Sequence, residues 1–285
     1  LLQMFKKMLT ELESVERALI EYLETKRTAF PRFYFLSNEE LLKILSQTTH
    51  PSAVQPYLKR CFENIGSITF KGSDFVTEMT SVEGELVPFQ HPTQLTGSVE
   101  HWMLGVEAEM RNTLQKIIEN SVSLYPSKPR TEWVFEWPAQ VLIAVFQIMW
   151  TAETEEAIKN GTLENYHSTV HQQLLDLAKL TTLDLTPIQR TAVSSLIVME
   201  MHNRDIVFKL KEQNVSSIDQ FEWISQLRQY FANSFVYIRM VNAELTYGYE
   251  YLGSTSRLVI TPLTDRCYLT LLTALDMQMG GAPQG

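Results

Sequence analysis

Apolar residues recur at helical spacing along most of the chain. In the segment from Leu1 to about Lys26 they form one face between charged positions, and Pro31 ends the pattern. Further helices are predicted at about 38–45, 52–64, 99–121, 139–160, 163–180, 187–213 and 218–231. The pattern therefore predicts a mainly α protein, an elongated multi-helix bundle.

The predicted helix from Ala139 to about Asn160 differs from the others because it is apolar nearly all round as far as Trp150 and charged after it. We expect its first half to be buried and its second half to be solvated. The longest apolar run, Val141 to Trp150, is too short to span a bilayer. No membrane helix is expected.

Strand-like segments interrupt the helices. A small antiparallel meander is predicted near 67–89, where β-type residues occur in short runs separated by glycine-containing turns. Aromatic and β-branched residues also predict an extended segment at 32–36 and short strands or an irregular hairpin at 236–245 and 249–252. A final short strand is expected at 258–260.

Three helix starts carry clear signals. Ser37 and Glu40 have the spacing of a capping box. Thr186-Pro187 and Thr261-Pro262 each place a polar N-cap before a proline at the first helical position. The last of these begins a helix with apolar residues spaced by four, and we expect it to end at Gly280-Gly281. Those apolar residues are Leu263, Cys267, Leu271 and Leu275.

Composition and charge narrow the range of partners. The 285 residues carry 24 Lys and Arg against 33 Asp and Glu, a formal charge of −9. This acidic balance argues against nucleic acid or an anionic membrane as the main partner. The two cysteines, Cys61 and Cys267, are far apart and indicate neither a disulfide framework nor a zinc site, which fits a reducing compartment.

Candidate catalytic chemistry is weak throughout. His167 and His171 have the spacing of a helical metal pair, but no third ligand lies nearby in sequence, and a surface pair is the better interpretation. Clustered glutamates on helices favour solvation over acid and base catalysis. No Gly-Lys-Ser/Thr occurs, so a complete phosphate-binding loop is absent from this sequence. Nothing supports catalysis by this chain alone.

Several sequence blocks nevertheless resemble one family. These blocks are Arg32 to Leu42, Ser81 to Glu85, Val99 to Trp102, Glu109 to Arg111, Trp137 to Gln140, Gln147 to Thr151, Tyr247 to Gly253 and Leu258 to Tyr268. Through them the chain is similar to the C-terminal part of the linker of a dynein heavy chain, running into its first AAA+ module, and it resembles axonemal more than cytoplasmic types.

The resemblance implies a division of the chain and a nucleotide-binding role for its end. Residues 1–250 would be linker, a helical lever arm, and residues 251–285 the N-terminal edge of the first AAA+ module. In the family, a segment equivalent to 258–264 packs against the adenine, and the phosphate loop begins at the position of Gly285. The implied nucleotide-binding residues are Leu258, Val259, Ile260, Thr261, Pro262, Leu263, Thr264 and Gly285.

The resemblance also implies cofactors, partners and a location. The parent heavy chain would bind ATP or ADP with Mg, hydrolyse ATP and move along microtubules. Its partners would be the AAA+ ring of the same chain, microtubules and other dynein subunits, in a ciliary or flagellar axoneme or alternatively in the cytoplasm. A different class of function stays open, namely a helical scaffold, unrelated to motors, that recruits a protein partner through acidic faces.

Overall fold

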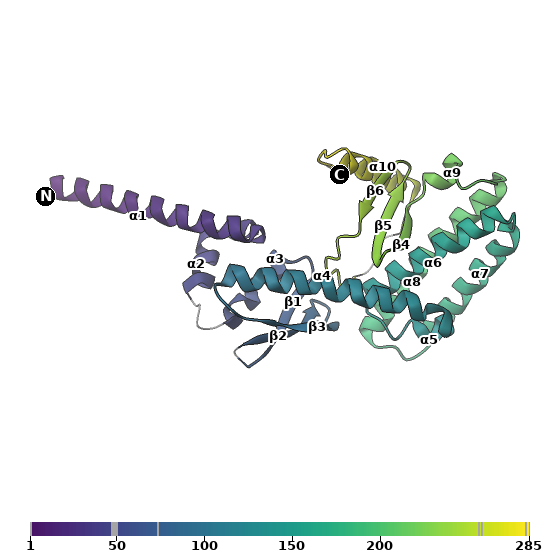
Figure 1. Cartoon of the computed structure of the whole chain (residues 1–285), viewed down its shortest axis with the longest axis horizontal. Coiled ribbons are helices and arrows are strands. Elements are labelled where there is room, and N and C mark those ends of the chain that lie inside the picture. The colour runs from purple at the N-terminus through teal and green to yellow at the C-terminus, as the bar shows by residue number, and fades with distance from the viewer. Residues whose placement is uncertain are drawn as a thin grey trace. The chain divides into compact units, whose positions relative to one another are not determined.

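The computed structural model describes residues 2–284 except 47–50, 73, 256, 258 and 283. The side chain of Pro126 is not described either. The chain divides into two compact units. Unit one comprises Leu1–Thr113 together with Glu250–Leu252, and unit two comprises Leu114–Tyr249 together with Gly253–Gly285. Both units combine helices with a three-stranded antiparallel sheet, which confirms the mainly α fold with a small meander (Figure 1).

Unit one begins with a long helix followed by short ones. The capping box of Ser37 and Glu40 is confirmed, because Glu40 N donates to Ser37 Oγ at 3.3 Å and Ser37 N donates to Glu40 Oε2 at 3.1 Å. The helices are α1 (Leu2–Ala29), the 3-10 helix η1 (Pro31–Phe35), α2 (Asn38–Ser46), the 3-10 helix η2 (Pro51–Tyr57), α3 (Leu58–Cys61) and α4 (Val99–Leu124), whose last residues belong to unit two.

The predicted extended segment at 32–36 is wrong. Pro31 occupies the first turn of η1, where its fixed φ suits a helix. The residues that follow then place Phe33 in the core while Phe35 is 71% exposed. Phe33 packs edge-on against Phe30, with ring centroids 4.9 Å apart. Aromatic content alone suggested a strand, but the proline start and the burial of one aromatic ring favour a tight helical turn.

The meander is confirmed with wider bounds than 67–89. Strands β1 (Ile65–Lys71), β2 (Phe75–Ser81) and β3 (Leu86–Gln94) pair in sequence order. Met79 lies opposite Ile68 on β1 and opposite Val87 on β3. All three side chains are buried, so one face of the sheet forms part of the core of unit one.

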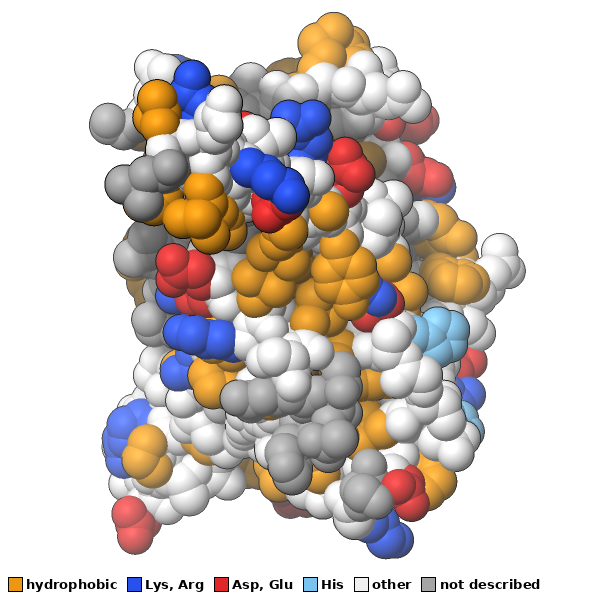
Figure 2. Space-filling model, turned by 90° about the vertical axis from the view of Figure 1, so that its left-hand side faces the viewer, with side chains coloured by type: hydrophobic (Ala, Val, Ile, Leu, Met, Phe, Trp, Pro, Cys, Tyr) orange, Lys and Arg blue, Asp and Glu red, His pale blue; other side chains and the backbone are white. Residues whose placement is uncertain are grey.

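Helix α1 is mostly exposed although its sequence is amphipathic. Within its described residues 2–29, Leu23 and Arg27 are buried. Figure 2 shows hydrophobic side chains gathered among charged ones on the face where the N-terminus of α1 lies in Figure 1. The exposed apolar residues of α1 are Leu2, Met4, Phe5, Met8, Leu9, Leu12, Val15, Leu19, Ile20 and Tyr22.

Unit two is built on long helices whose bounds agree with the predicted ones. Its further helical elements are the 3-10 helix η3 (Tyr125–Ser127), α5 (Arg130–Trp133), α6 (Ala139–Lys159), α7 (Leu163–Leu180), α8 (Pro187–Glu212) and α9 (Phe221–Ile224). The first half of α6 is buried as expected, although Thr154, Ala157 and Ile158 in its second half are buried too. After α6, Gly161 adopts a φ of 66°, the left-handed conformation that glycine tolerates.

A single helix at 218–231 was predicted, and the structure contradicts it. The segment contains short α9 and then strand β4 (Arg228–Ala232), which pairs with β5 (Phe235–Met240) and through it with β6 (Ala243–Thr246). Tyr230 lies opposite Tyr237 in the sheet, and Gln229 N donates to Thr151 Oγ1 of α6 at 3.2 Å. These tertiary partners outweigh the local helical spacing. The expected strand at 249–252 is also absent, since no strand covers these described residues.

A buried ion pair lies in the helical core of unit two. Arg130 Nη2 donates to Glu200 Oε1 at 3.0 Å, and its guanidinium lies 4.3 Å from the ring centroid of Phe146. The Glu200 side chain is only 2% exposed. Burial raises the pKa of the Glu200 carboxyl, and the Arg130 charge opposes that rise. The nearby Glu153 carboxyl also has a raised pKa, mainly because of burial.

The last helix, α10 (Pro262–Asp276), lies against β6 and β5. None of its residues, all of which the structure describes, is buried. The strand expected at 258–260 is not formed at Val259 and Ile260, and Leu258 lies outside the described residues. The helix also ends before Gly280-Gly281, because Gln278 takes the left-handed conformation (φ 58°) and Met279 N donates to Ala274 O at 2.8 Å. In the described part of the chain, no helix could cross a membrane.

Candidate functional site

The candidate nucleotide-facing segment, residues 259–264, combines an irregular stretch with the first turn of α10. The predicted N-cap is confirmed, since Thr264 N donates to Thr261 Oγ1 at 3.4 Å and Thr261 N donates to Thr264 Oγ1 at 3.3 Å. Pro262 occupies the first position of the helix. Both hydroxyls are therefore used to hold the turn, which fixes the direction in which the segment enters α10.

Two apolar side chains of this segment face solvent. Val259 is 68% exposed and Leu263 is 71% exposed. Ile260 is half-buried and lines a cavity of about 60 Å³ together with Met199 and Ile206 of α8. The segment thus presents an outer apolar side and is fixed to unit two on its inner side. Two other predicted site residues, Leu258 and Gly285, lie outside the described residues.

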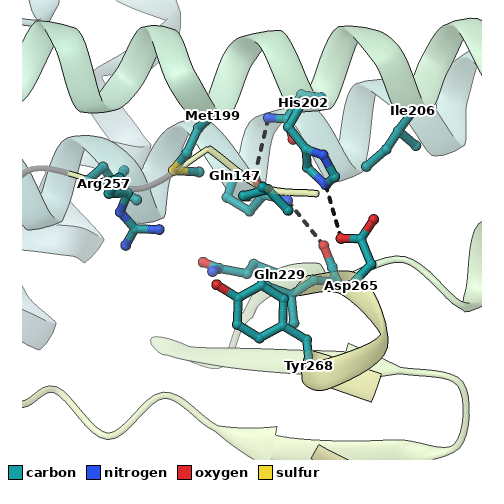
Figure 3. A pocket seen from close by; sticks show the side chains of 12 residues that line it. Gln147, Met199, His202, Ile206, Gln229, Arg257, Asp265 and Tyr268 are labelled. Carbon is teal, nitrogen blue, oxygen red and sulfur yellow. Dashed lines mark hydrogen bonds and ion pairs between the residues drawn. The ribbon is translucent and has the colours of Figure 1, made fainter. Parts of the chain in front are cut away.

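Figure 3 shows the cavity on the inner side of the segment, where residues of α6, α8, β4 and α10 meet. The side chain of Gln147 in α6 contacts both α8 and the residue before β4. Its Oε1 accepts from Asn203 Nδ2 of α8 at 3.3 Å, and its Nε2 donates to the backbone carbonyl of Leu227 at 3.1 Å. Arg257, Gln229 and Tyr268 complete its polar lining.

A histidine and a carboxylate lie close together in the lining of the cavity. His202 Nε2 of α8 lies 3.5 Å from Asp265 Oδ1 in the first turn of α10. Burial lowers the pKa of His202, whereas the Asp265 carboxylate opposes that change. The pair links α8 to the start of α10, so it helps to fix the position of the segment that precedes it.

The size of the cavity decides what it can hold. A space of about 60 Å³ has room for a few water molecules but not for a purine base. On the exposed side of the segment, Val259 and Leu263 offer apolar surface of the kind that a nucleotide base packs against. The residues present fit one wall of an adenine site. The described residues 259–264 include no lysine or arginine that could bind a phosphate chain.

The sequence interpretation missed the inner wall of this site. Gln147, His202 and Gln229 are polar residues of α6, α8 and β4, and they meet only because these elements pack together. Gln147 alone has a sequence signal, since it is a polar residue within the apolar run from Val141 to Trp150. The predicted surface pair is consistent with the structure: His171 is exposed and His167 packs on Phe208, with ring centroids 5.5 Å apart. Among the described residues no group of three or more metal-ligating side chains is found.

Comparison with known families gives these observations a context. Residues 1–121 match the family described as "Dynein heavy chain, N-terminal region 2", and residues 247–285 match the "Hydrolytic ATP binding site of dynein motor region". The second match contains the whole candidate segment and α10. A region that matches a dynein N-terminal region is thus followed, on the same chain, by one that matches the ATP-binding site of a dynein motor region.

Individual relatives extend the similarity over nearly the whole chain. The chain is 52% identical over 96% of its length to dynein axonemal heavy chain 1 of Homo sapiens, and 45% identical over 96% to dynein axonemal heavy chain 3 of Mus musculus. The chain belongs to the dynein heavy chain family. It spans only 6% and 7% of the length of these two relatives.

Proposed function

We propose that this chain is the ring-proximal part of the dynein linker together with the N-terminal edge of the first AAA+ module. In this role it couples ATP binding and hydrolysis in the ring to force production along microtubules. The observation that carries the proposal is the order of the two family matches, in which a dynein N-terminal region is followed on the same chain by an ATP-binding region. The division at 250/251 is part of this proposal.

The structure supports a mechanical role for the helical body. Helices α6 and α8 share a continuous buried core, in which the rings of Trp150 and Trp223 lie 5.4 Å apart. Close-packed interiors transmit strain instead of absorbing it. The segment at 259–264 is fixed to this core on its inner side by Ile260 and by the pair of His202 and Asp265. A change at the nucleotide would therefore act directly on a rigid body.

The proposed nucleotide contacts follow from the same geometry. Val259, Pro262 and Leu263 would contact the adenine of ATP or ADP, while Ile260, Thr261 and Thr264 would hold the segment in place. Bound ATP with Mg would supply the transferable phosphoryl group. By the family resemblance, Leu258 and Gly285 would contribute to the same site as one adenine contact and the start of the phosphate loop.

The partners and location of the parent protein are also proposals. The chain would act with the AAA+ ring of the same heavy chain, with microtubules and with other dynein subunits. Its relatives are named axonemal heavy chains, which supports a place in the cytoskeleton of a ciliary or flagellar axoneme. The long match to dynein heavy chains does not favour a scaffold unrelated to motors.

Nucleotide affinity of the full-length heavy chain tests the proposed site. We expect Leu263→Asp to raise the KM for ATP strongly, because a charge would replace apolar surface against the base. The matched control is Leu183→Asp, which alters an exposed leucine outside the segment. An unchanged KM in the Leu263 variant would contradict the proposed adenine contact.

The mechanical role needs a structural test. Cryo-electron microscopy of the full-length heavy chain with and without an ATP analogue should show the helical body in different positions on the ring. A body that kept one position in both states would count against the lever role.

A further inference from the structure

Three residues of unit one lie far along the sequence from the rest of that unit, which ends at Thr113. Glu250–Leu252, here called the anchor segment, belong to unit one although both Tyr249 and Gly253 belong to unit two. These two neighbours have positive φ angles of 52° and 61°. Such a conformation is uncommon for a tyrosine and persists where the surrounding contacts impose it. The chain thus turns sharply on each side of the anchor segment.

The first anchor is a bidentate ion pair. Arg32 of η1 donates from Nη1 to Glu250 Oε1 at 2.8 Å and from Nη2 to Glu250 Oε2 at 2.6 Å. The fork geometry of a guanidinium makes such pairs strong and directional. The backbone N–H of Glu63 also donates to Glu250 Oε1, at 3.2 Å. Glu250 is therefore held in one position by a side chain and a main-chain group of unit one.

Arg32 is itself fixed by other groups of unit one. Its Nη1 donates to the carbonyl of Cys61 at 3.0 Å, and its guanidinium lies 4.7 Å from the ring centroid of Phe62. Its Nε lies 3.1 Å from Glu107 Oε2 of α4. Arg32 thus forms ion pairs with two carboxylates, one on a helix of unit one and one on the anchor segment.

The next two residues of the segment are held just as firmly. Tyr251 is fully buried, and its hydroxyl donates to Glu85 Oε2 at 2.8 Å. Burial and the nearby Glu85 carboxylate raise the pKa of Tyr251, so the hydroxyl stays a donor at physiological pH. The carbonyl of Leu252 accepts from Asn64 Nδ2 at 2.8 Å.

The residues flanking the anchor segment are fixed within unit two. Before the segment, Tyr249 Oη accepts from Val236 N of β5 at 2.9 Å. After it, Ser254 Oγ donates to the carbonyl of Ile188 at 3.3 Å, and the carbonyl of Thr255 accepts from Ser195 Oγ at 3.0 Å. The nucleotide-facing segment at 259–264 follows shortly after these contacts.

We propose that Arg32, Glu250 and Tyr251 form a force-bearing anchor that ties the chain to unit one shortly before the nucleotide-facing segment. This inference rests on the proposed lever function and adds to it the residues through which the load passes. A short irregular stretch of chain transmits force only if its residues are fixed, because slack would absorb the movement. The ion pair, the buried tyrosine and the Asn64 contact supply that fixation. Arg32 and Glu250 are positioning residues and touch no nucleotide.

Two isosteric variants of the full-length heavy chain test the anchor. Glu250→Gln removes the carboxylate on the anchor segment, and Glu107→Gln removes the other carboxylate that Arg32 serves. In Glu250→Gln we expect the ratio of microtubule gliding velocity to ATP turnover to fall by about fivefold, the lower end of typical coupling effects between sites. We expect Glu107→Gln to leave the ratio near that of the unchanged protein, because the bidentate pair is retained.

Each outcome of this comparison is informative. Equal ratios in the two variants, or a proportional fall in velocity and turnover in Glu250→Gln, would overturn the anchor. If the heavy chain without any substitution hydrolysed ATP but did not move microtubules, the proposed function would be refuted instead. If Glu250→Gln fails to fold, Tyr251→Phe keeps the aromatic ring and removes the hydroxyl that donates to Glu85. The anchor predicts a smaller fall of the same ratio in that variant, and an unchanged ratio there would contradict it.

Discussion

Helices α8 and α10 begin in the same way and differ in almost everything that follows. Each starts with a Thr-Pro pair, and each has a capping box closed by the residue at the third helical position. Yet α8 has ten buried residues, and α10, described in full, has none. The same local chemistry thus begins a core helix in one place and a surface helix in the other.

The comparison separates two sources of helix stability. A capping box satisfies backbone N–H groups at the first turn, and its contribution is local. Most of the stability of a helix in a protein comes from packing of its apolar face. Helix α8 has that packing within unit two, whereas α10 keeps apolar residues such as Leu263 and Leu275 exposed. Under the proposed function, the adenine would cover Leu263 and the rest of the AAA+ module would cover Leu275.

The largest expected difference concerns the acidic residues of the two helices. Glu200→Gln in α8 should lower the free energy of unfolding by about 3 kcal/mol, because it leaves the buried Arg130 charge without its ion-pair partner. Among the described residues, two atoms of that guanidinium, Nε and Nη1, have no hydrogen-bond partner. Urea denaturation of this chain measures the change. The matched variant Asp265→Asn in α10 should change the unfolding energy much less, and similar losses would contradict the comparison.

Apolar truncation should give the next largest contrast. Leu196→Ala in α8 removes a fully buried side chain and should cost about 2 to 5 kcal/mol of stability. Leu263→Ala in α10 removes an exposed one and should change stability by less than about 0.5 kcal/mol. The same denaturation experiment measures both. A large loss in the second variant would show that α10 buries its apolar face within this chain.

Removal of the caps should separate local from global effects. Thr186→Val and Thr261→Val each delete the hydroxyl that accepts a backbone N–H, which costs about 1 kcal/mol in a typical helix. In α8 the loss should appear in the unfolding of the whole unit. In α10 it should appear as faster amide hydrogen exchange in the first turn, with little change in global stability. The reverse pattern would contradict this division.

The smallest expected effect depends on pH and involves the contact between the two helices. Burial lowers the pKa of His202 below its usual value of 6.5, so protonation of His202 costs more in the folded state. The stability linked to this group is therefore present above pH 6.5 and is lost as the pH falls through the lowered pKa. Asp265, Lys209 and Asp205 are the charged groups that act on it.

Hydrogen exchange of α10 measures this pH effect. Protection of the α10 amides, corrected for intrinsic exchange, should fall between pH 7.5 and pH 5. His202→Gln keeps a polar side chain that cannot become charged, and it should remove most of this dependence. A pH dependence that persisted in His202→Gln would assign the effect to another group.

Local signals made much of the fold predictable. The capping boxes at Ser37, Thr186 and Thr261 each join residues three apart, so both partners of each box can be found within a short stretch of sequence. The long amphipathic helices and the meander follow from hydrophobic periodicity in the same way. The segment at 218–231 was mispredicted because the partners of β4 lie on α6 and β5 and are invisible to a local pattern.

The candidate site shows the same limit. The N-cap and the exposed leucine of the segment at 259–264 were within reach of the sequence, but its inner wall was not. Gln147 and His202 lie far from the segment in the sequence and reach it only through packing. The pair of Arg32 and Glu250 joins residues 218 positions apart, a separation at which no spacing rule operates.

The two cysteines also have a practical consequence. Cys61 is buried, and burial raises the pKa of its thiol to about 12, so it is a poor nucleophile at neutral pH. Cys267 is exposed on α10. In this 285-residue chain, a maleimide dye should therefore attach at a single position, on α10, without any engineered cysteine. Light emitted from that position would report on the surroundings of the last helix.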